Sequence, residues 1–213
     1  MRAWPISQSS CGSSDQAGLS AVPPQPAAMP RTFLAIDLPE AVQQALREAC
    51  PRKADGVRPV LEGQLHLTLH FLGDVASDRL PPLLGAVQAI SFDAFDLTIA
   101  GVGRFPPRGR ATVLWAGLTA SEPLHRLHRH IGSALQEAGF RIERRQYTPH
   151  ITLARLSSHA AAGFVDTFLS SAADLSLPPF TVTGFVAYES QKTPHGSQHL
   201  PLLRVSAAAS RRN

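Results

Sequence analysis

Residues 66–73, HLTLHFLG, decide the fold because they combine a buried strand with polar side chains at regular positions. Side chains of an extended strand alternate between its two faces, so His66, Thr68 and His70 share one face. The other face carries only apolar side chains, those of Leu65, Leu67, Leu69 and Phe71. The pattern therefore predicts a strand with one face in the core and one polar face.

The same pattern returns in residues 149–155, PHITLAR. His150 and Thr152 share one face of this second predicted strand, and Ile151 and Leu153 share the other. A single histidine in a strand is more often a structural residue than a catalyst. Two HxTL motifs in one chain favour a function instead, and we interpret them as two halves of one site.

The elements around the two motifs follow one another in a repeated order. We expect strands at 31–38, 64–73, 95–105, 112–118, 148–155, 180–189 and 199–206, and helices at 40–50, 80–90, 121–138 and 160–171. The third helix has a Ser121 cap, apolar residues at 124, 127, 131 and 135, and a closing Gly139. This order predicts an α+β fold that is bilobal and duplicated, in which two antiparallel sheets flank a central cleft and the helices lie on the outside.

The bulk composition fits one ordinary globular domain. The chain has 213 residues, of which 44% are hydrophobic and 17% are charged. The formal net charge of +4 permits a polyanionic partner without requiring one. Cys11 and Cys50 have no ligand spacing, so we expect no disulfide framework. No apolar run is long enough to span a membrane, and we expect a cytoplasmic protein.

The composition also divides the chain. Residues 1–28 are rich in Ser, Gln, Pro, Gly and Ala without an apolar period, so we expect a disordered leader. Residues 29–206 form the single bilobal domain of this interpretation, with Met29 as a candidate initiator. Residues 207–213 are predicted to be a disordered tail.

The motifs together resemble those of a known family. HLTLHFLG and YTPHITLAR, with FLAIDLP near the domain start and VLWAGL between them, are similar to the two-histidine (2H) phosphoesterases. The similarity is greatest to the RNA 2′,3′-cyclic phosphodiesterase branch, also called 2′-5′ RNA ligases (LigT-like), and it covers roughly residues 30–205. The resemblance implies a bilobal fold with a central cleft, no metal or cofactor, and hydrolysis of a cyclic phosphate at an RNA end to a 2′-phosphomonoester.

The residue types suit this chemistry independently of the family. Opening a cyclic phosphodiester requires a base to take a proton from water and an acid to supply one to the leaving ribose oxygen. Imidazole, with an ordinary pKa of about 6.5, serves both needs near neutral pH. The hydroxyls of Thr68 and Thr152 are expected to bind phosphate oxygens. By analogy with the family, His150 is the base and His66 is the acid.

Three further residues are candidates with an alternative for each. The resemblance makes Arg155 a phosphate or ribose contact and Phe71 a stacking partner for the terminal base. Simple strand alternation, however, puts both on the core face, where Phe71 would be a core residue and Arg155 a solvated strand end. His70 shares the face of His66 and is interpreted as a cleft-lip residue that contacts the RNA backbone.

Other polar clusters favour a structural interpretation. His125, His128 and His130 lie on one predicted helix without nearby carboxylates or thiolates, so we expect a solvated helix face rather than a metal site. Residues 101–110 and 143–147 contain arginines that either line turns or add positive potential for RNA.

Three functions remain open at this level. The first is a metal-independent phosphodiesterase, expected to be a monomer, that acts on RNA 3′ ends or nucleotides with a 2′,3′-cyclic phosphate. The second is the same chemistry on another small cyclic phosphate or a 2′-5′ linkage, with weak reverse ligation. The third is a non-catalytic RNA-binding module that retains the cleft, and the four intact HxTL histidines and threonines favour an enzyme over it.

Overall fold

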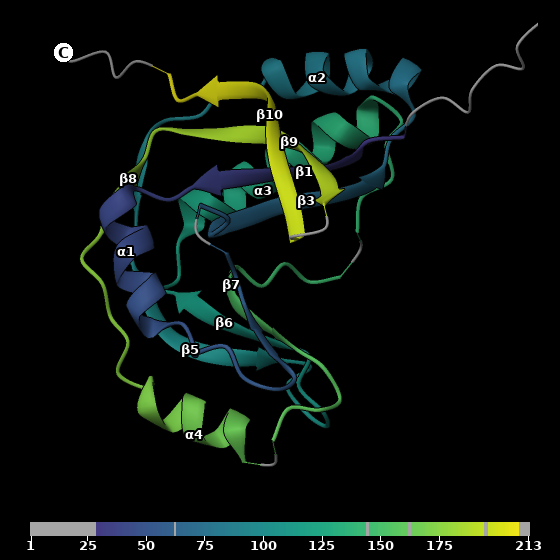
Figure 1. Ribbon diagram of the computed structural model, residues 1–213. Coiled ribbons are helices and arrows are strands. Elements are labelled where there is room, and N and C mark those ends of the chain that lie inside the picture. Colours follow the sequence, from purple (N-terminus) through teal and green to yellow (C-terminus); the bar gives the residue numbers. More distant parts are fainter. Residues whose placement is uncertain (1–28, 62, 144, 162, 194–195, 209–213) are drawn as a thin grey trace, which may run out of the picture.

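The computed structural model describes residues 29–61, 63–143, 145–161, 163–193 and 196–208 (Figure 1). The predicted leader, residues 1–28, lies outside these ranges, as do residues 209–213. The predicted tail does not begin at 207, because Ala207 donates a backbone hydrogen bond to Thr183 and Ala208 donates one to Phe92, each 2.8 Å long. Among the described residues, no helix combines the length and the apolar character needed to cross a membrane.

The described strands form an eight-stranded and a two-stranded sheet, and all pairings are antiparallel. The large sheet has the order β10-β9-β1-β3-β7-β6-β5, with β2 paired to β7. Its strands are β1 (Arg31–Asp37), β2 (Val57–Pro59), β3 (His66–Asp74), β5 (Ile99–Phe105), β6 (Val113–Leu118), β7 (Ile151–Leu156), β9 (Gly184–Thr193) and β10 (Gly196–Ser206). The small sheet pairs β4 (Phe95–Leu97) with β8 (Phe180–Val182).

The large sheet consists of two halves that meet at the motif strands. The β10-β9-β1-β3 half meets the β7-β6-β5 half through one register pair, Leu67 with Ile151. The mixed α+β class and the antiparallel pairing agree with the prediction, but the two lobes share one continuous sheet instead of having one each. Both residues are fully buried, and buried backbone groups need partners, which accounts for the junction.

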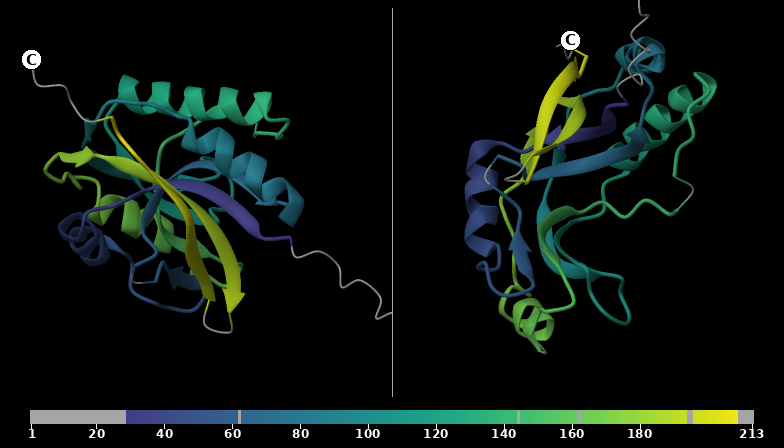
Figure 2. Two further views of the ribbon diagram at one scale, coloured as in Figure 1. Left: turned by 90° about the horizontal axis from the view of Figure 1, so that it is seen from above. Right: turned by 45° about the vertical axis from the view of Figure 1, so that its right-hand side comes forward.

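The helices divide between the two halves (Figures 1 and 2). They are α1 (Glu40–Ala49), α2 (Leu80–Gln88), α3 (Glu122–Glu137) and α4 (Phe164–Ser171), and a 3-10 turn, η1 (Ser77–Arg79), precedes α2. Helix α2 packs against α3 and β10, and α3 contacts β3, whereas α4 contacts β5. The Oγ of Ser121 caps α3 as predicted, accepting a 3.4 Å hydrogen bond from the backbone N–H of Leu124.

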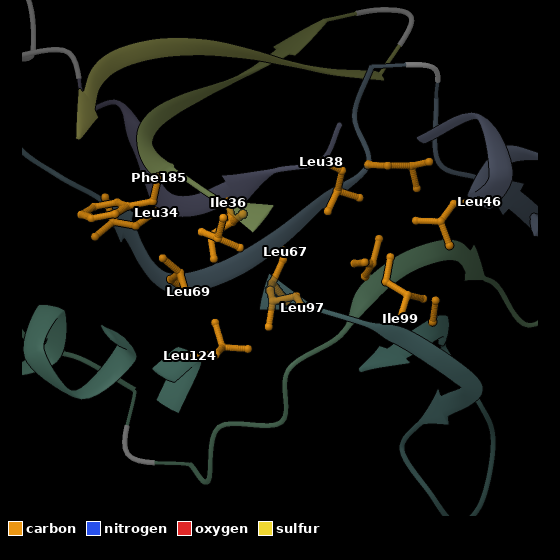
Figure 3. Close-up of a cluster of buried hydrophobic side chains, with 14 of the residues drawn as sticks. Leu34, Ile36, Leu38, Leu46, Leu67, Leu69, Leu97, Ile99, Leu124 and Phe185 are labelled. Atoms are coloured by element: carbon orange, nitrogen blue, oxygen red, sulfur yellow. The ribbon is translucent and has the colours of Figure 1, made fainter. Parts of the chain in front are cut away.

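The core runs through both halves of the sheet and fixes the motif strands in place. Side chains from β1, β3, β9 and α3 form one part of the cluster, and those from α1 and β5 form another; Figure 3 labels among them Leu34, Leu67, Leu69, Leu124, Phe185, Leu46 and Ile99. Leu67 and Leu69 are among these buried residues, so the apolar face predicted for the first motif is in the core as far as Leu69. The predicted apolar stripe of α3 is buried too, at Leu124, Leu127, Ile131 and Leu135.

Candidate active site

Each motif strand has a β-bulge at the fourth residue of its HxTL motif. In the β1–β3 register, Leu34 pairs with His70 and Ala35 pairs with Thr68, so Leu69 is left without a partner. In the β6–β7 register, Leu114 pairs with Ala154 and Trp115 pairs with Thr152, so Leu153 is left without one. An extra residue in one strand reverses the alternation of the side chains that follow it.

The bulges bring two further residues onto the polar face. Phe71 and Arg155 each follow the motif histidine by five residues, and simple alternation assigned both to the core face. Phe71 is instead 46% exposed. Both side chains line a cavity of about 550 Å³ together with His66, Thr68 and Thr152. The alternation argument was therefore wrong beyond each bulge.

The same shift removes His70 from the cleft lip. Its side chain is only 5% exposed, and its Nε2 lies 2.9 Å from the backbone carbonyl oxygen of His128. The His70 and His128 rings stack with centroids 4.1 Å apart. His70 is thus a buried residue that joins β3 to α3, and the prediction of an exposed contact for RNA was wrong. His128 also departs from the expected solvated face, since it is partly buried in this stack.

The two motif histidines are held in the same way. Nδ1 of His66 lies 2.8 Å from the carbonyl oxygen of Gln64, and Nδ1 of His150 lies 2.8 Å from that of Thr148. A carbonyl oxygen only accepts hydrogen bonds, so Nδ1 of each ring is the protonated nitrogen. Nε2 is then the basic nitrogen of both neutral rings, available to take a proton or, once protonated, to give one.

The site extends over two adjoining cavities. His66 lines the cavity of about 550 Å³, and His150 lines a second cavity of about 730 Å³. Thr68 and Phe71 line both, so the two cavities are adjacent. All seven predicted site residues therefore line one or both of these adjacent cavities, His70 with only 5% of its surface exposed.

Burial favours the neutral form of both histidines. Burial, with smaller contributions from the nearby His199 and Arg155, lowers the pKa of His66 to about 4, against the raising effects of the Gln64 hydrogen bond and of Asp37. Burial also lowers the pKa of His150, opposed by its hydrogen bond to Thr148. In the free protein at pH 7 both rings are therefore neutral.

Several neighbours of His66 were missed by the sequence interpretation. The His199 ring meets the His66 ring edge-on at 5.2 Å, and Phe33 lies 5.0 Å from His66. Asp37, which pairs with His66 in the β1–β3 register, accepts hydrogen bonds from Tyr188 at 2.6 Å and Arg204 at 2.9 Å. All of these residues lie in predicted strands, but none of them belongs to a sequence motif that would have assigned it to the site.

His150 has a different aromatic environment. The Phe105 ring meets it edge-on at 4.8 Å, and the Trp115 ring lies 6.3 Å away. Phe105 ends β5 and Trp115 lies in β6, the two strands that follow β7 in the sheet order. The described residues contain no group of three or more His, Cys, Asp or Glu side chains arranged to hold a metal ion. The two motifs are thus alike in their backbone but differ in the side chains around each ring.

Comparison with known proteins identifies the family. A family model described as the 2′-5′ RNA ligase superfamily matches residues 37–194, which is more than half of the chain. The chain belongs to the 2′-5′ RNA ligase superfamily. The resemblance that the two HxTL motifs carry is therefore confirmed.

Superfamily members with curated names and solved structures agree over most of the chain. An RNA 2′,3′-cyclic phosphodiesterase of Thermotoga maritima is 30% identical over 78% of this chain and 89% of its own length. The RNA 2′,3′-cyclic phosphodiesterase of Escherichia coli is 29% identical, over 82% of this chain and 94% of its own. The crystal structure of E. coli LigT complexed with 3′-AMP has a TM-score of 0.67 at 27% identity, covering 85% of this chain and 99% of that one. These relatives bear out the prediction of an enzyme, a phosphoric diester hydrolase.

Proposed function

We propose that this enzyme hydrolyses RNA or nucleoside 2′,3′-cyclic phosphates to 2′-phosphomonoesters without a metal or other cofactor, and that it acts as a monomer. Its relatives from T. maritima and E. coli carry the name RNA 2′,3′-cyclic phosphodiesterase. The observation that carries the proposal is the matched pair of Nδ1 hydrogen bonds, which leaves Nε2 of His66 and of His150 as the reactive nitrogens.

His150 is proposed as the base and His66 as the acid. Neutral His150 accepts a proton from water at Nε2, and the water oxygen forms a new bond to phosphorus. The bond from phosphorus to the ribose 3′ oxygen breaks, and protonated His66 donates its Nε2 proton to that oxygen. His150 has then gained one proton and His66 has lost one. Proton exchange of both rings with solvent restores the starting state. Weak 2′-5′ ligation would run the same steps in reverse.

The remaining site residues are proposed to bind the substrate. The hydroxyls of Thr68 and Thr152 donate to non-bridging phosphate oxygens, where negative charge accumulates during the reaction. The guanidinium of Arg155 adds a fixed positive charge on the same face of β7. The Phe71 ring, which is 46% exposed, stacks on the terminal base. The negative charge of the bound phosphodiester raises the pKa of the acid, because an opposite charge favours the protonated imidazole.

We also propose that the cleft is a duplicated arrangement with the two motifs as equivalents. The bulges at Leu69 and Leu153 support this, since they stand at the same motif position and turn the same later residue into the cleft. The identical Nδ1 hydrogen bonds support it as well. Two histidines on opposite sides of a phosphorus atom are the geometry that in-line displacement requires.

The test is hydrolysis of a nucleoside 2′,3′-cyclic phosphate, and of a short RNA that ends in one, in the presence of EDTA. The wild type, His66→Ala and His150→Ala are compared, with His130→Ala on the exposed face of α3 as the matched control. We expect chelator-resistant turnover to the 2′-phosphate in the wild type and control, and a loss of at least about 100-fold in each motif variant. Turnover that survives both substitutions, or binding of RNA without turnover, would contradict the proposal.

A further inference from the structure

Two arginines stand directly opposite each other at one end of the cleft. In the β2–β7 pairing, Arg58 is the register partner of Arg155. Residues paired in this way point to the same face of an antiparallel sheet, with Cβ atoms roughly 5 Å apart. Their neighbours fit this assignment, because Val57 and its partner Leu156 are both buried on the opposite face.

Arg58 therefore lies on the same face of the sheet as Arg155, beside the cavity that Arg155 lines. Val60, two residues after Arg58 along an extended segment, lines the cavity of about 550 Å³ with Arg155 and His66. The backbone N–H of Val60 donates a 2.9 Å hydrogen bond to the carbonyl oxygen of Leu153, the bulged residue of β7. This bond keeps the segment after β2 beside β7 and holds Arg58 next to Arg155.

Among the described residues, the two positive charges have no negative partner. Other arginines have one: Arg129 pairs with Glu122, Arg145 with Glu143, and Arg204 with Asp37. Over the part of the chain that the structure describes, neither the Arg58 nor the Arg155 side chain has a hydrogen bond or ion pair. Like charges on directly opposite strand positions destabilise a sheet, and a bound anion removes that cost.

We propose that Arg58 is a substrate-binding residue that takes the phosphodiester preceding the cyclic phosphate, so that the site selects RNA 3′ ends over mononucleotides. This rests on the proposed function, in which Thr68, Thr152 and Arg155 serve the cyclic phosphate. Thr152 and Arg155 are three residues apart on β7, a span of roughly 10 Å at most. Arg58 lies one strand further on, where the next phosphate of a bound chain can reach it. Guanidinium groups are well suited to this contact because they bind phosphate oxygens in pairs.

The experiment compares three substrates: a nucleoside 2′,3′-cyclic phosphate, a short RNA that ends in one, and the same RNA with an uncharged methylphosphonate as its last linkage. The wild type is compared with Arg58→Gln, and Arg126→Gln on α3, away from this cavity, is the matched loss of charge. We expect Arg58→Gln to lower kcat/KM on the normal RNA about three- to tenfold, mainly through KM. Its turnover of the nucleoside substrate and all values for Arg126→Gln should stay within about twofold of wild type.

The methylphosphonate substrate isolates the contact. The wild type should lose about the same three- to tenfold on it, and Arg58→Gln should lose nothing further, because the partner charge is already gone. The KM of the normal RNA should also depend less steeply on salt in Arg58→Gln, by about one in the logarithmic slope.

Two outcomes would overturn this inference alone, provided that the wild type is active. In one, Arg58→Gln loses equally on the nucleoside and RNA substrates. In the other, the wild type turns over the methylphosphonate RNA as well as the normal RNA. A wild type that is inactive on every substrate would overturn the proposed function as well. Thermal unfolding at low salt serves as the folding control, since removal of one of two opposed charges should leave the midpoint of Arg58→Gln at or above that of wild type.

Discussion

The hydroxyl of Tyr147 donates a 3.0 Å hydrogen bond to the backbone carbonyl of Thr68, and it thereby connects the two motifs. Tyr147 precedes Thr148, whose carbonyl oxygen accepts the hydrogen bond from His150. The same Tyr147 ring stacks on His128 with centroids 3.9 Å apart. Since the motif strands share only one register pair, Leu67 with Ile151, this side chain is a second fixed point between them.

Tyr147→Phe should therefore lower kcat with little change in KM. The substitution keeps the stacked ring but removes the donor to Thr68, so the distance between Thr68 and His150 is less well fixed. We expect a several-fold loss of kcat and a loss of about 1 kcal/mol in the free energy of unfolding. Thr181→Val, which removes an exposed hydrogen bond to Asp96 in the small sheet, is the control. A rise in KM at unchanged kcat would contradict a positioning role.

The pH dependence of kcat/KM should reflect the lowered pKa values of the free enzyme. The base acts above its pKa and the acid acts below its own, and burial lowers the pKa of His66 to about 4 and that of His150 below its ordinary value. We expect kcat/KM to peak below about pH 6.5 and to decline at higher pH. The peak of kcat should lie at higher pH, because the bound phosphodiester raises both pKa values. A kcat/KM peak above about pH 7 would show that burial does not control these groups.

His199→Gln should move the part of this profile that His66 controls. Charged His199 and Arg155 lower the pKa of His66, whereas Asp37 raises it. Removing His199 therefore raises the pKa of His66, and the corresponding limb should shift to higher pH in full profiles of kcat/KM. The limb that belongs to His150 should stay in place, since His199 is not among the groups that shift the pKa of His150. Equal shifts of both limbs would contradict the pairing of His199 with His66.

Phe71→Leu tests the stacking platform. The Phe71 ring carries the Arg31 guanidinium at 5.0 Å from its centroid, and the ring is exposed, so we expect a change of less than about 0.5 kcal/mol in stability. Loss of base stacking, worth about 1–3 kcal/mol, should raise KM for a nucleoside cyclic phosphate by about fivefold to 150-fold. Phe140→Leu is the control, since Arg79 lies 4.6 Å from the Phe140 centroid and Phe140 lines neither cavity of the site. An unchanged KM for Phe71→Leu would remove this residue from the site.

The sequence was sufficient for the features that depend on local pattern. The Ser121 cap and the apolar stripe of α3 are set by residues within one helix, and the two HxTL strands are set by alternation over four residues. The side chains up to Leu69 and up to Leu153 therefore lie on the faces predicted for them.

The features that were missed depend on pairing with distant strands. Nothing about a leucine at position 69 or 153 indicates that it will be left unpaired in the register with β1 or β6. The reversal of alternation that exposes Phe71 and buries His70 was therefore not predictable. His199 reaches His66 only because β9 and β10 continue the sheet beyond β1. Long-range register, rather than local preference, decides these positions.

The stacked pair of His70 and His128 should make the protein sensitive to acid. Burial, together with the charges of His70, His125 and Arg129, lowers the pKa of His128 to about 4. Burial lowers the pKa of His70 as well, against the raising effect of its hydrogen bond to the His128 carbonyl. The unfolded chain binds these protons more readily than the folded one, so the stability gained from the neutral rings is complete above about pH 6.5 and is lost as the pH falls towards 4.

His128→Phe should reduce this loss. A phenyl ring can stack on both Tyr147 and His70, and the backbone carbonyl that bonds His70 is retained, but the group no longer titrates. After allowance for its partial exposure, His128 should account for roughly 1–2 kcal/mol of the stability lost on acidification. The midpoint of thermal unfolding should therefore fall less between about pH 7 and about pH 4.5 in His128→Phe than in wild type. His130→Phe, an exposed change on the same helix, should follow the wild type. Parallel curves for all three proteins would mean that the stacked ring of His128 does not resist protonation.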